Sequence, residues 1–406
     1  MTLALGPAFF RLTLANLAAQ SAEQISLAAV PMVAVLALGA GPGEIGALAA
    51  AQTLPFLLLS MPVGLLADRV SKRRLMQWAE ALRVQAFVGL LLAAVSDNLS
   101  MALLAVLGFI GATGTVGFSV AAPAYLPTLV PMALLGAANG RLELARSAAF
   151  AAGPALAGAL VAWAGATPAF VVAAVLSSAA LVLLLALPAA ATPAVAPRRH
   201  PLLDLKEGAL LVWRNTLLRP ILLTAVAWNM AWFVLQAAYV PYAVQSLGLS
   251  AGQVGFTLAA YGVGMVMGAL AAPRVLRALP FGQAVLLGPA LSVLASVVML
   301  GTLVWPTAAA ATLSFFLFGV GPIIWTITST TLRQTVTPAA LLGRVTAIFL
   351  TVNMGARPVG ALLGAWVGAS WGAQACLWLA MSGFVLQAAV IMASAVRTLR
   401  HLPKAA

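Results

Sequence analysis

The chain is a succession of long apolar stretches separated by very short breaks, and this pattern restricts its fold more than any other feature. A helix that spans a membrane needs about 20 mostly apolar residues. The chain is 63% hydrophobic and 7% charged, whereas a soluble domain carries about 25% charged residues. A soluble fold of this length could not bury so much apolar surface, so the bilayer must be the solvent.

The length of the stretches also indicates the type of spanning structure. Strands of a membrane β-barrel alternate in polarity over about ten residues, and these stretches are longer and continuously apolar. We therefore expect an all-α membrane protein with twelve transmembrane helices, the first of them retained rather than cleaved as a signal peptide. The predicted spans are 9–38, 45–66, 75–95, 100–127, 136–163, 168–188, 217–246, 252–272, 282–304, 307–332, 340–367 and 372–395.

The positions of the basic residues explain the net charge of +13. Lys and Arg gather in alternate breaks, and the breaks between these carry neither. Basic loops remain on the cytoplasmic side, so both termini are predicted to be cytoplasmic in a multi-pass protein of the inner (plasma) membrane. No nucleic-acid partner is needed to explain the charge. The basic positions are Arg11, 69–74, 198–219, 274–277, 333–344 and 397–404.

The longest break, 189–216, divides the chain into two similar halves. It begins with an Ala/Pro tract, and its weakly amphipathic pattern over 202–213 predicts a helix at the membrane interface. A six-residue motif recurs in the halves, as Pro-Met-Ala-Leu-Leu-Gly from Pro131 and Pro-Ala-Ala-Leu-Leu-Gly from Pro338. The predicted organisation is a six-helix bundle over 1–188, a linker over 189–216, a second bundle over 217–396 and a tail over 397–406.

One acid and four bases separate the second and third spans, in Gly64-Leu-Leu-Ala-Asp68-Arg69-Val-Ser-Lys72-Arg73-Arg74. We expect a short loop at the membrane surface here. The stretch resembles the signature that the major facilitator superfamily carries between spans two and three, and a copy at 268–274 has lost the acid. The resemblance covers nearly the whole chain. It implies two six-helix bundles that move by alternating access about a site near the middle of the membrane.

The resemblance also implies that this cluster forms part of a cytoplasmic gate. The gate residues would be Gly64, Asp68, Arg69 and Arg73, with Arg344 of the eleventh span as the partner of Asp68. A carboxylate at a helix end can accept hydrogen bonds from a neighbouring helix N-terminus. The alternative is a cluster that only fixes orientation, but an acid in a basic loop adds little to orientation.

Two further stretches resemble the branch of drug/proton antiporters and siderophore or macrolide exporters. One runs from Asn139 to Ser147 and on through Gly153-Pro154 to Gly158, and the other spans 332–345. Gly153, Pro154 and Gly158 are predicted to bend the fifth span and give it a small-residue face for close helix packing. Ala157 stands where the branch usually has a second glycine. The resemblance implies efflux, including the multidrug-resistance type.

Charged residues inside the spans are candidates for proton coupling, because each costs about 2.5–3.5 kcal/mol on insertion scales. Glu23 lies near the middle of the first span, and the fifth span carries Arg141, Glu143 and Arg146. A buried carboxylate without a close partner can exchange a proton near neutral pH. The alternatives are structural ion pairs, Glu23 with Arg141 or Arg146 and Glu143 with Arg146.

The third and fourth spans are expected to contribute nothing to proton coupling. Glu80 and Arg83 are expected to extend toward the cytoplasmic surface, where long side chains keep their charge in water. The fourth span carries no charge, although many proton antiporters have a base there. Both histidines, His200 and His401, fall in cytoplasmic segments.

Aromatic and polar residues of the seventh, tenth and eleventh spans are predicted to line a substrate cavity. A large apolar wall with a few polar groups suits a lipophilic, even cationic, ligand. The alternatives are interface anchors or core packing for the tryptophans, and an anion-binding or interfacial position for Arg357. The predicted cavity residues are Asn229, Trp232, Phe233, Gln236, Tyr239, Trp325 and Arg357.

Other chemistries lack sequence support. The chain contains no phosphate-binding loop of the Gly-x-x-x-x-Gly-Lys type, no His/Cys cluster with metal spacing and no nucleophile–base pair in a span, so we expect no enzyme activity, metal or cofactor. Its single cysteine, Cys376, excludes an intrachain disulfide. The predicted function is secondary active transport, namely proton-coupled efflux of small amphipathic or lipophilic molecules by a monomer in the lipid bilayer. The alternatives are a metabolite importer of the same fold, or a non-transporting sensor or lipid-handling protein.

Overall fold

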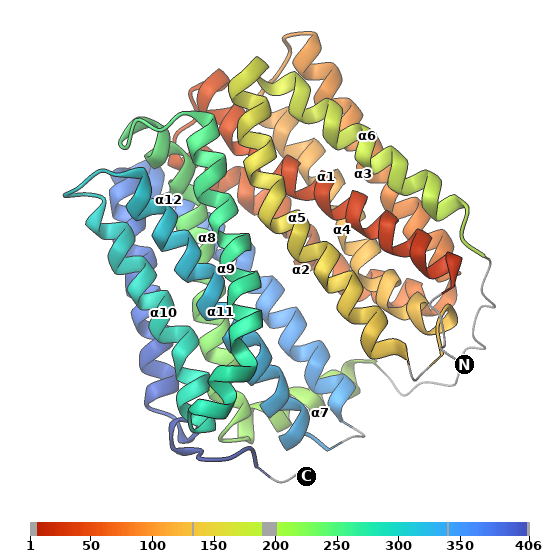
Figure 1. Ribbon diagram of the computed structural model, residues 1–406, viewed down its shortest axis with the longest axis vertical. Helices are drawn as coiled ribbons and strands as arrows, with labels where there is room; N and C mark the ends of the chain where they lie inside the picture. The colour runs from red at the N-terminus through yellow and green to blue at the C-terminus, as the bar shows by residue number, and fades with distance from the viewer. Residues whose placement is uncertain (1–5, 132–133, 189–200, 339–340, 404–406) are drawn as a thin grey trace. The chain divides into compact units, whose positions relative to one another are not determined.

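A computed structural model describes residues 6–131, 134–188, 201–338 and 341–403, and within these ranges the chain is helical and contains no strand. Figure 1 shows the helices in chain order. They are α1 (Pro7–Leu38), α2 (Pro42–Arg69), α3 (Lys72–Val95), α4 (Met101–Tyr125), η1 (Leu126–Thr128), α5 (Leu135–Ala164), α6 (Ala166–Leu185), α7 (Pro201–Arg214), α8 (Leu218–Gln245), α9 (Ala251–Ala278), α10 (Phe281–Gly301), α11 (Ala308–Val336), α12 (Leu342–Met392) and η3 (Ala395–Thr398).

Eleven of the described helices are long and apolar enough to cross a membrane, and the last of them supplies two spans. A helix needs about 20 residues to cross, and α12 has 51. Gly372 breaks it with φ of 78°, a left-handed conformation that favours glycine. The chain therefore has the predicted fold, an all-α membrane protein with twelve spans. The short helix α7 covers 202–213, where an amphipathic helix was predicted within the linker, and its position at the membrane interface stays a prediction.

The turn between α2 and α3 is shorter than the sequence predicted. The basic stretch from Gly64 to Arg74 was expected to form a loop, but α2 continues to Arg69 and α3 begins at Lys72. Only Val70 and Ser71 lie outside the helices. Most of the charged residues are therefore on the ends of the two helices.

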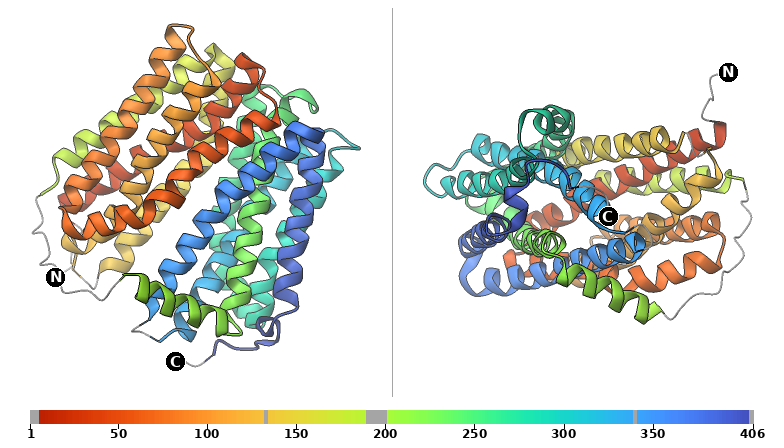
Figure 2. Two further views of the ribbon diagram at one scale, coloured as in Figure 1. Left: turned by 180° about the vertical axis from the view of Figure 1, so that it is seen from behind. Right: turned by 90° about the horizontal axis from the view of Figure 1, so that it is seen from below.

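The chain divides into two compact units. The first contains residues 1–40, 51–196 and 249–259, and the second contains residues 41–50, 197–248 and 260–406. In the first unit α1 packs on α5 and α6, and α3 packs on α4 and α6; in the second, α12 packs on α8 and α10, and α10 packs on α11. Figure 2 shows the helices of each unit from two further sides. The helices of each unit thus form a bundle around an interior of their own.

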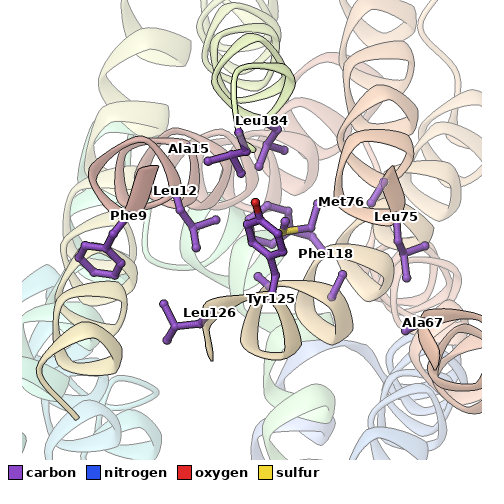
Figure 3. Packing of buried hydrophobic residues seen from close by; sticks show 14 of the residues in the cluster. Phe9, Leu12, Ala15, Ala67, Leu75, Met76, Phe118, Tyr125, Leu126 and Leu184 are labelled. Carbon is purple, nitrogen blue, oxygen red and sulfur yellow. The ribbon is translucent and has the colours of Figure 1, made fainter. Parts of the chain in front are cut away.

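The interior of the first unit is filled by apolar side chains near the ends of α3 and α4. Leu12 of α1, Met76 of α3 and Tyr125 of α4 are each fully buried, and Figure 3 shows the cluster around the Tyr125 ring. The Tyr125 hydroxyl donates a hydrogen bond of 2.7 Å to the carbonyl of Pro188, just after α6. The buried polar end of the ring is therefore satisfied, as a buried tyrosine requires.

Candidate functional site: two polar clusters inside the helical units

Three charged side chains meet in the interior of the first unit, halfway along their helices. Arg83 of α3 lies 3.1 Å from Glu80 of the same helix and 3.8 Å from Glu23 of α1, measured between nitrogen and carboxylate oxygen. The side chains of Arg83 and Glu80 are 2% and 0% exposed, and that of Glu23 is 17% exposed. We call Glu23, Glu80 and Arg83 the buried charge cluster.

The neighbouring helices satisfy the remaining polar atoms of the buried charge cluster. Arg83 also donates to the carbonyl of Ala19 on α1, and the hydroxyl of Ser177 on α6 donates to Glu80. The Arg83 guanidinium lies 5.9 Å from the centre of the Phe87 ring. Charged groups buried in this way remain in place only when paired and hydrogen-bonded. Glu80 and Arg83 are thus bound on several sides, and Glu23 is the partner with the longer contact and the greater exposure.

A glycine on α4 makes room for Arg83. A β-carbon added at Gly114 would lie 2.4 Å from the Ala79 carbonyl oxygen and 2.5 Å from Cγ of Arg83. Only a residue without a side chain allows α3 to approach α4 this closely at that level. The arginine stem therefore runs between α3 and α4 and carries the guanidinium toward α1.

These positions overturn one expectation and supply a partner that the sequence did not indicate. Glu80 and Arg83 were expected to reach the cytoplasmic surface, but both are buried. The sequence left open an ion pair of Glu23 with Arg141 or Arg146; in the structure Glu23 forms an ion pair with Arg83, and the positive charge of Arg146 also acts on it. The signal that could have identified Arg83 was its distance from both ends of α3, roughly 17 Å at 1.5 Å per residue.

The charges of α5 include an ion pair on that helix, and the positive charge of Arg146 also acts on Glu23. Arg146 donates from Nε to both carboxylate oxygens of Glu143 at 3.1 and 3.0 Å, and a terminal nitrogen donates at 2.6 Å. The predicted pair is thus present, three residues apart and partly exposed. The Arg146 guanidinium lies 5.4 Å from the centre of the Phe150 ring, and Arg141 is exposed.

The predicted gate residues are only partly described. The side chains of Asp68 and Arg69 lie outside the described part, so the pairing of Asp68 with Arg344 stays a prediction. Arg73 donates a 2.9 Å hydrogen bond to the carbonyl of Leu185, at the C-terminal end of α6 where a cation is favoured. Arg344, at the start of α12, forms an ion pair with Glu207 of α7. Gly64 would tolerate a β-carbon, because no heavy atom lies within 4 Å of that position.

The predicted packing motif of α5 contacts two different helices. A β-carbon at Gly153 would lie 2.5 Å from Cβ of Gln24 on α1, and one at Gly158 would lie 2.7 Å from Cα of Gly255. Gly255 belongs to the first turns of α9, which are part of the first unit. Pro154 is buried within the helix. The small-residue face therefore brings α5 close to both α1 and the start of α9.

The aromatic residues of α8 divide into two faces. Trp228 and Trp232 stack with ring centres 5.3 Å apart, Trp232 packs edge-on against Phe318 of α11, and Trp228 donates a 3.2 Å hydrogen bond to Ser292 of α10. Tyr239 was predicted to line the cavity but is fully buried against Phe315. This face belongs to the packed interior of the second unit.

The other face of α8 is polar and partly exposed. It carries Asn229, Phe233 and Gln236, which lie on one side of the helix because they are four and three residues apart. Arg357 of α12 donates from Nε to the side-chain oxygen of Asn229 at 3.3 Å, and its guanidinium lies 5.8 Å from the centre of the Phe233 ring. We call Asn229, Phe233 and Arg357 the arginine–asparagine site. Trp325 of α11 lies elsewhere, packed over Gly288 of α10.

Among the described residues, no three or more His, Cys, Asp or Glu side chains gather closely enough to bind a metal ion. The single thiol, Cys376, is buried in α12 and contacts the carbonyl of Gly364.

Comparison with known proteins identifies the kind of protein that this chain resembles. A family model described as Major Facilitator Superfamily matches residues 12–361. The enterobactin exporter EntS of Escherichia coli O81 (strain ED1a) is 29% identical over 305 residues, which cover 74% of this chain and 71% of that protein.

Solved structures share the fold at low sequence identity. The nucleoside transporter NupG superposes with a TM-score of 0.76 at 12% identity, covering 96% of this chain and 99% of that chain. A D-xylose–proton symporter superposes with a TM-score of 0.71 at 15% identity, covering 95% and 97% of the two chains.

Proposed function

We propose that this chain, which belongs to the major facilitator superfamily, exports small amphipathic or lipophilic molecules in exchange for protons. Membership of the family makes it a multi-pass membrane transporter. Export, proton coupling and the class of cargo are our proposal, and the similarity to a bacterial exporter over 74% of the chain supports the direction. The working cycle would be alternating access, with the proton gradient as the energy source.

The observation that supports proton coupling most strongly is the charge balance of the buried charge cluster. Two carboxylates share one guanidinium within the bundle, so the cluster has one more negative than positive charge when both acids are ionised. A proton on Glu23 would make the cluster neutral, which a low-dielectric interior favours. Glu23 is the member with the longest contact and the greatest exposure, so it is the acid best placed to exchange a proton.

The other predicted residues take supporting roles in this proposal. The charges of α5 would adjust the electrostatic potential at Glu23; they are Arg141 and the ion pair of Glu143 with Arg146. Gly64, Asp68, Arg69, Arg73 and Arg344 would close the cytoplasmic side, and Gly153, Pro154 and Gly158 would let α5 pack and bend during the cycle. The polar face of α8 would contact the cargo.

Replacing Glu23 by Gln tests the proposal, because the amide keeps the shape of the acid and removes the exchangeable proton. The full chain in liposomes is assayed with amphipathic fluorescent dyes of either charge under an imposed pH gradient. We expect the pH gradient to accelerate dye transport by the native protein. In E23Q this acceleration should be smaller by at least about tenfold. The control Asp97→Asn removes an exposed acid at a positive-φ loop position that Asn also adopts, and it should behave as the native protein.

The other outcomes identify the competing functions. Undiminished gradient-driven transport by E23Q would remove the coupling role of Glu23. Uptake instead of extrusion in right-side-out vesicles would assign the chain as an importer. Dye binding without any transport would indicate a sensor or a lipid-handling protein.

A further inference from the structure

We propose that one water molecule is bound in the interior of the second unit, between the side chains of Thr224, Asn353 and Gln387. Thr224 belongs to α8. Gly372 divides α12 into a first limb, which carries Asn353, and a second limb, which carries Gln387. We call Thr224, Asn353 and Gln387 the buried polar layer. The inference concerns a ligand of the fold and does not depend on the proposed transport function.

Each residue of the buried polar layer has one polar atom that is shielded from solvent. These atoms are the hydroxyl oxygen of Thr224, the amide oxygen Oδ1 of Asn353 and the amide nitrogen Nε2 of Gln387. None of them has a hydrogen-bond partner within the part of the chain that the structure describes. Thr224 is 0% exposed and Gln387 is 2% exposed. Most buried polar atoms in native proteins do have a partner, either in the protein or in ordered water, so these three require an explanation.

The two limbs of α12 place Asn353 opposite Gln387. The thiol of Cys376 contacts the carbonyl of Gly364 at 3.4 Å, so the second limb folds back along the first and these two residues lie at one level. Asn353 precedes Gly364 by eleven residues, and Gln387 follows Cys376 by eleven. Eleven residues make three helical turns and about 16 Å. Both amides therefore lie at the same distance from the Cys376 contact and on the faces that meet there.

The first limb runs parallel to α8. A β-carbon at Gly360 would lie 2.8 Å from Cα of Met230, and one at Gly364 would lie 3.1 Å from Cα of Val234. The second contact is four residues after the first on both helices. Counting back from the first contact, six residues on α8 and seven on α12 reach the hydroxyl and the first amide of the buried polar layer. Their levels thus differ by about one residue, or 1.5 Å.

The second limb also packs on α8 and brings Gln387 near Thr224. A β-carbon at Gly383 would lie 2.8 Å from Cβ of Ala231 and 3.9 Å from the carbonyl oxygen of Ala227. The second limb runs antiparallel to α8, and Gln387 follows Gly383 by one turn, so it lies at the level of Ala227. Thr224 is three residues before Ala227, a rise of about 4.5 Å. The buried polar layer thus occupies about one helical turn of the contact between α8 and both limbs.

The three unpartnered atoms require a ligand that both donates and accepts hydrogen bonds. The oxygen of Asn353 only accepts, the nitrogen of Gln387 only donates, and the hydroxyl of Thr224 does either. A buried water typically makes about three hydrogen bonds to polar groups that are otherwise unsatisfied. A cation would face the N–H groups of Gln387, and an anion would face the oxygen of Asn353. A neutral water molecule is therefore the ligand that matches all three.

Thermal unfolding of the purified full chain tests the inference with three apolar variants of similar size: Thr224→Val, Asn353→Leu and Gln387→Met. If the water is bound, each variant removes one of its hydrogen bonds and should lower the unfolding temperature by about 2 °C or more. Without a ligand, each variant would remove an unsatisfied polar atom from the interior, and the unfolding temperature should stay or rise. An unchanged or raised unfolding temperature in any of the three overturns the inference.

Double variants distinguish a shared water from a direct bond between the two amides. With a shared water, every pair of substitutions should lower the unfolding temperature by less than the sum of the single effects, because the first substitution already weakens the site. Coupling confined to Asn353 and Gln387 would indicate a direct hydrogen bond and overturn the inference. Thr328→Val is the matched control, because Thr328 is also fully buried in the second unit but donates to the carbonyl of Ile324 at 2.9 Å. Its effect should add to that of Gln387→Met.

Two measurements on the native protein identify the ligand directly. In nuclear magnetic resonance spectra of the full chain in bilayers, the assigned side-chain amide protons of Gln387 should show a cross-peak to water. A missing cross-peak overturns the inference, even if no variant is recovered folded. The unfolding temperature should be the same in NaCl, KCl and choline chloride at equal ionic strength. A dependence on Na⁺ or K⁺ that Gln387→Met abolishes would identify a cation instead and overturn the inference as well.

Discussion

At the scale of single residues, Arg83 is the side chain on which the interior of the first unit depends. Its stem is enclosed by α3 and α4, and its guanidinium binds both carboxylates and the Ala19 carbonyl. Removing one partner from a buried ion pair costs about 3–5 kcal/mol, because it leaves an uncompensated charge. Arg83 is thus both a structural element and the counter-ion of the proposed coupling acid.

Arg83→Gln should lower the unfolding temperature of the detergent-solubilised protein, because it leaves two buried carboxylates without their shared cation. The expected loss is about 3–5 kcal/mol, as for other broken buried ion pairs. The double variant Glu80→Gln/Arg83→Gln should recover part of that loss, because it also removes one of the two carboxylates. A double variant that is no more stable than Arg83→Gln would contradict this account.

At the same scale, the sequence identified which residues were unusual but not which of them meet. Glu23 and the pair of Glu143 with Arg146 could be selected because charge is rare in the spans. The partner of Glu23 could not, since the rotation of α3 about its axis determines whether Arg83 faces α1. Likewise, Asn229 and Trp228 are adjacent in the sequence but lie on different faces of α8, one polar and one packed.

At the scale of helices, glycines set the spacing that brings the polar groups together. Gly114 allows α3 to contact α4, and Gly360 allows α12 to contact α8. Small residues at helix contacts are the usual means of close packing in a bilayer, where no hydrophobic force draws helices together. The two polar clusters are therefore each built beside a close helix contact.

Gly114→Ala should lower the unfolding temperature of the detergent-solubilised protein, with a loss of about 1–3 kcal/mol for overpacking. The added β-carbon would lie 2.4 Å from the Ala79 backbone oxygen, so α3 and α4 must separate. The control is Gly111→Ala on the same helix, where the nearest atom would be Cβ of Ala86 at 3.6 Å, an ordinary contact. This control should be neutral or stabilising because Ala is the better helix former. Equal effects of the two substitutions would argue against a special role for Gly114.

The helix boundaries followed closely from sequence, and the exceptions have local causes. Polarity changes abruptly at the ends of the spans, so most predicted ends lie within a few residues of those in the structure. The basic stretch after Gly64 is helical instead of a loop, because a two-residue turn suffices between α2 and α3. Charge density along the sequence therefore indicates where the membrane surface lies, but it does not indicate where a helix ends.

At the scale of the whole molecule, the alternation of basic breaks predicts the orientation of the chain in the membrane. Bases on the adjoining helix ends flank the turns after α2, α9 and α11, and the break at 96–100 contains neither Lys nor Arg. Basic loops remain cytoplasmic during insertion. We therefore expect the N- and C-termini inside the cell and the turn between α3 and α4 outside.

Cysteine labelling checks this orientation. The background is Cys376→Ser, which removes the single buried thiol. A thiol introduced by Asn98→Cys, at an exposed turn, should react with a membrane-impermeant maleimide on intact spheroplasts. A thiol introduced by Leu402→Cys, which is 39% exposed in the native chain, should react only after the membrane is opened. The reverse pattern would invert the predicted topology.

The sequence by itself determined the number of spans and their positions and predicted the linker helix, because these depend on hydrophobicity and charge along the chain. Its motifs carried the resemblance to the family. A bilayer sorts segments by exactly those linear properties, one span at a time. Only the tertiary structure showed that Glu23 meets Arg83 and that Arg357 meets Asn229. Those meetings depend on how each helix is rotated and how closely its neighbours approach, which close packing at a few glycines sets in three dimensions.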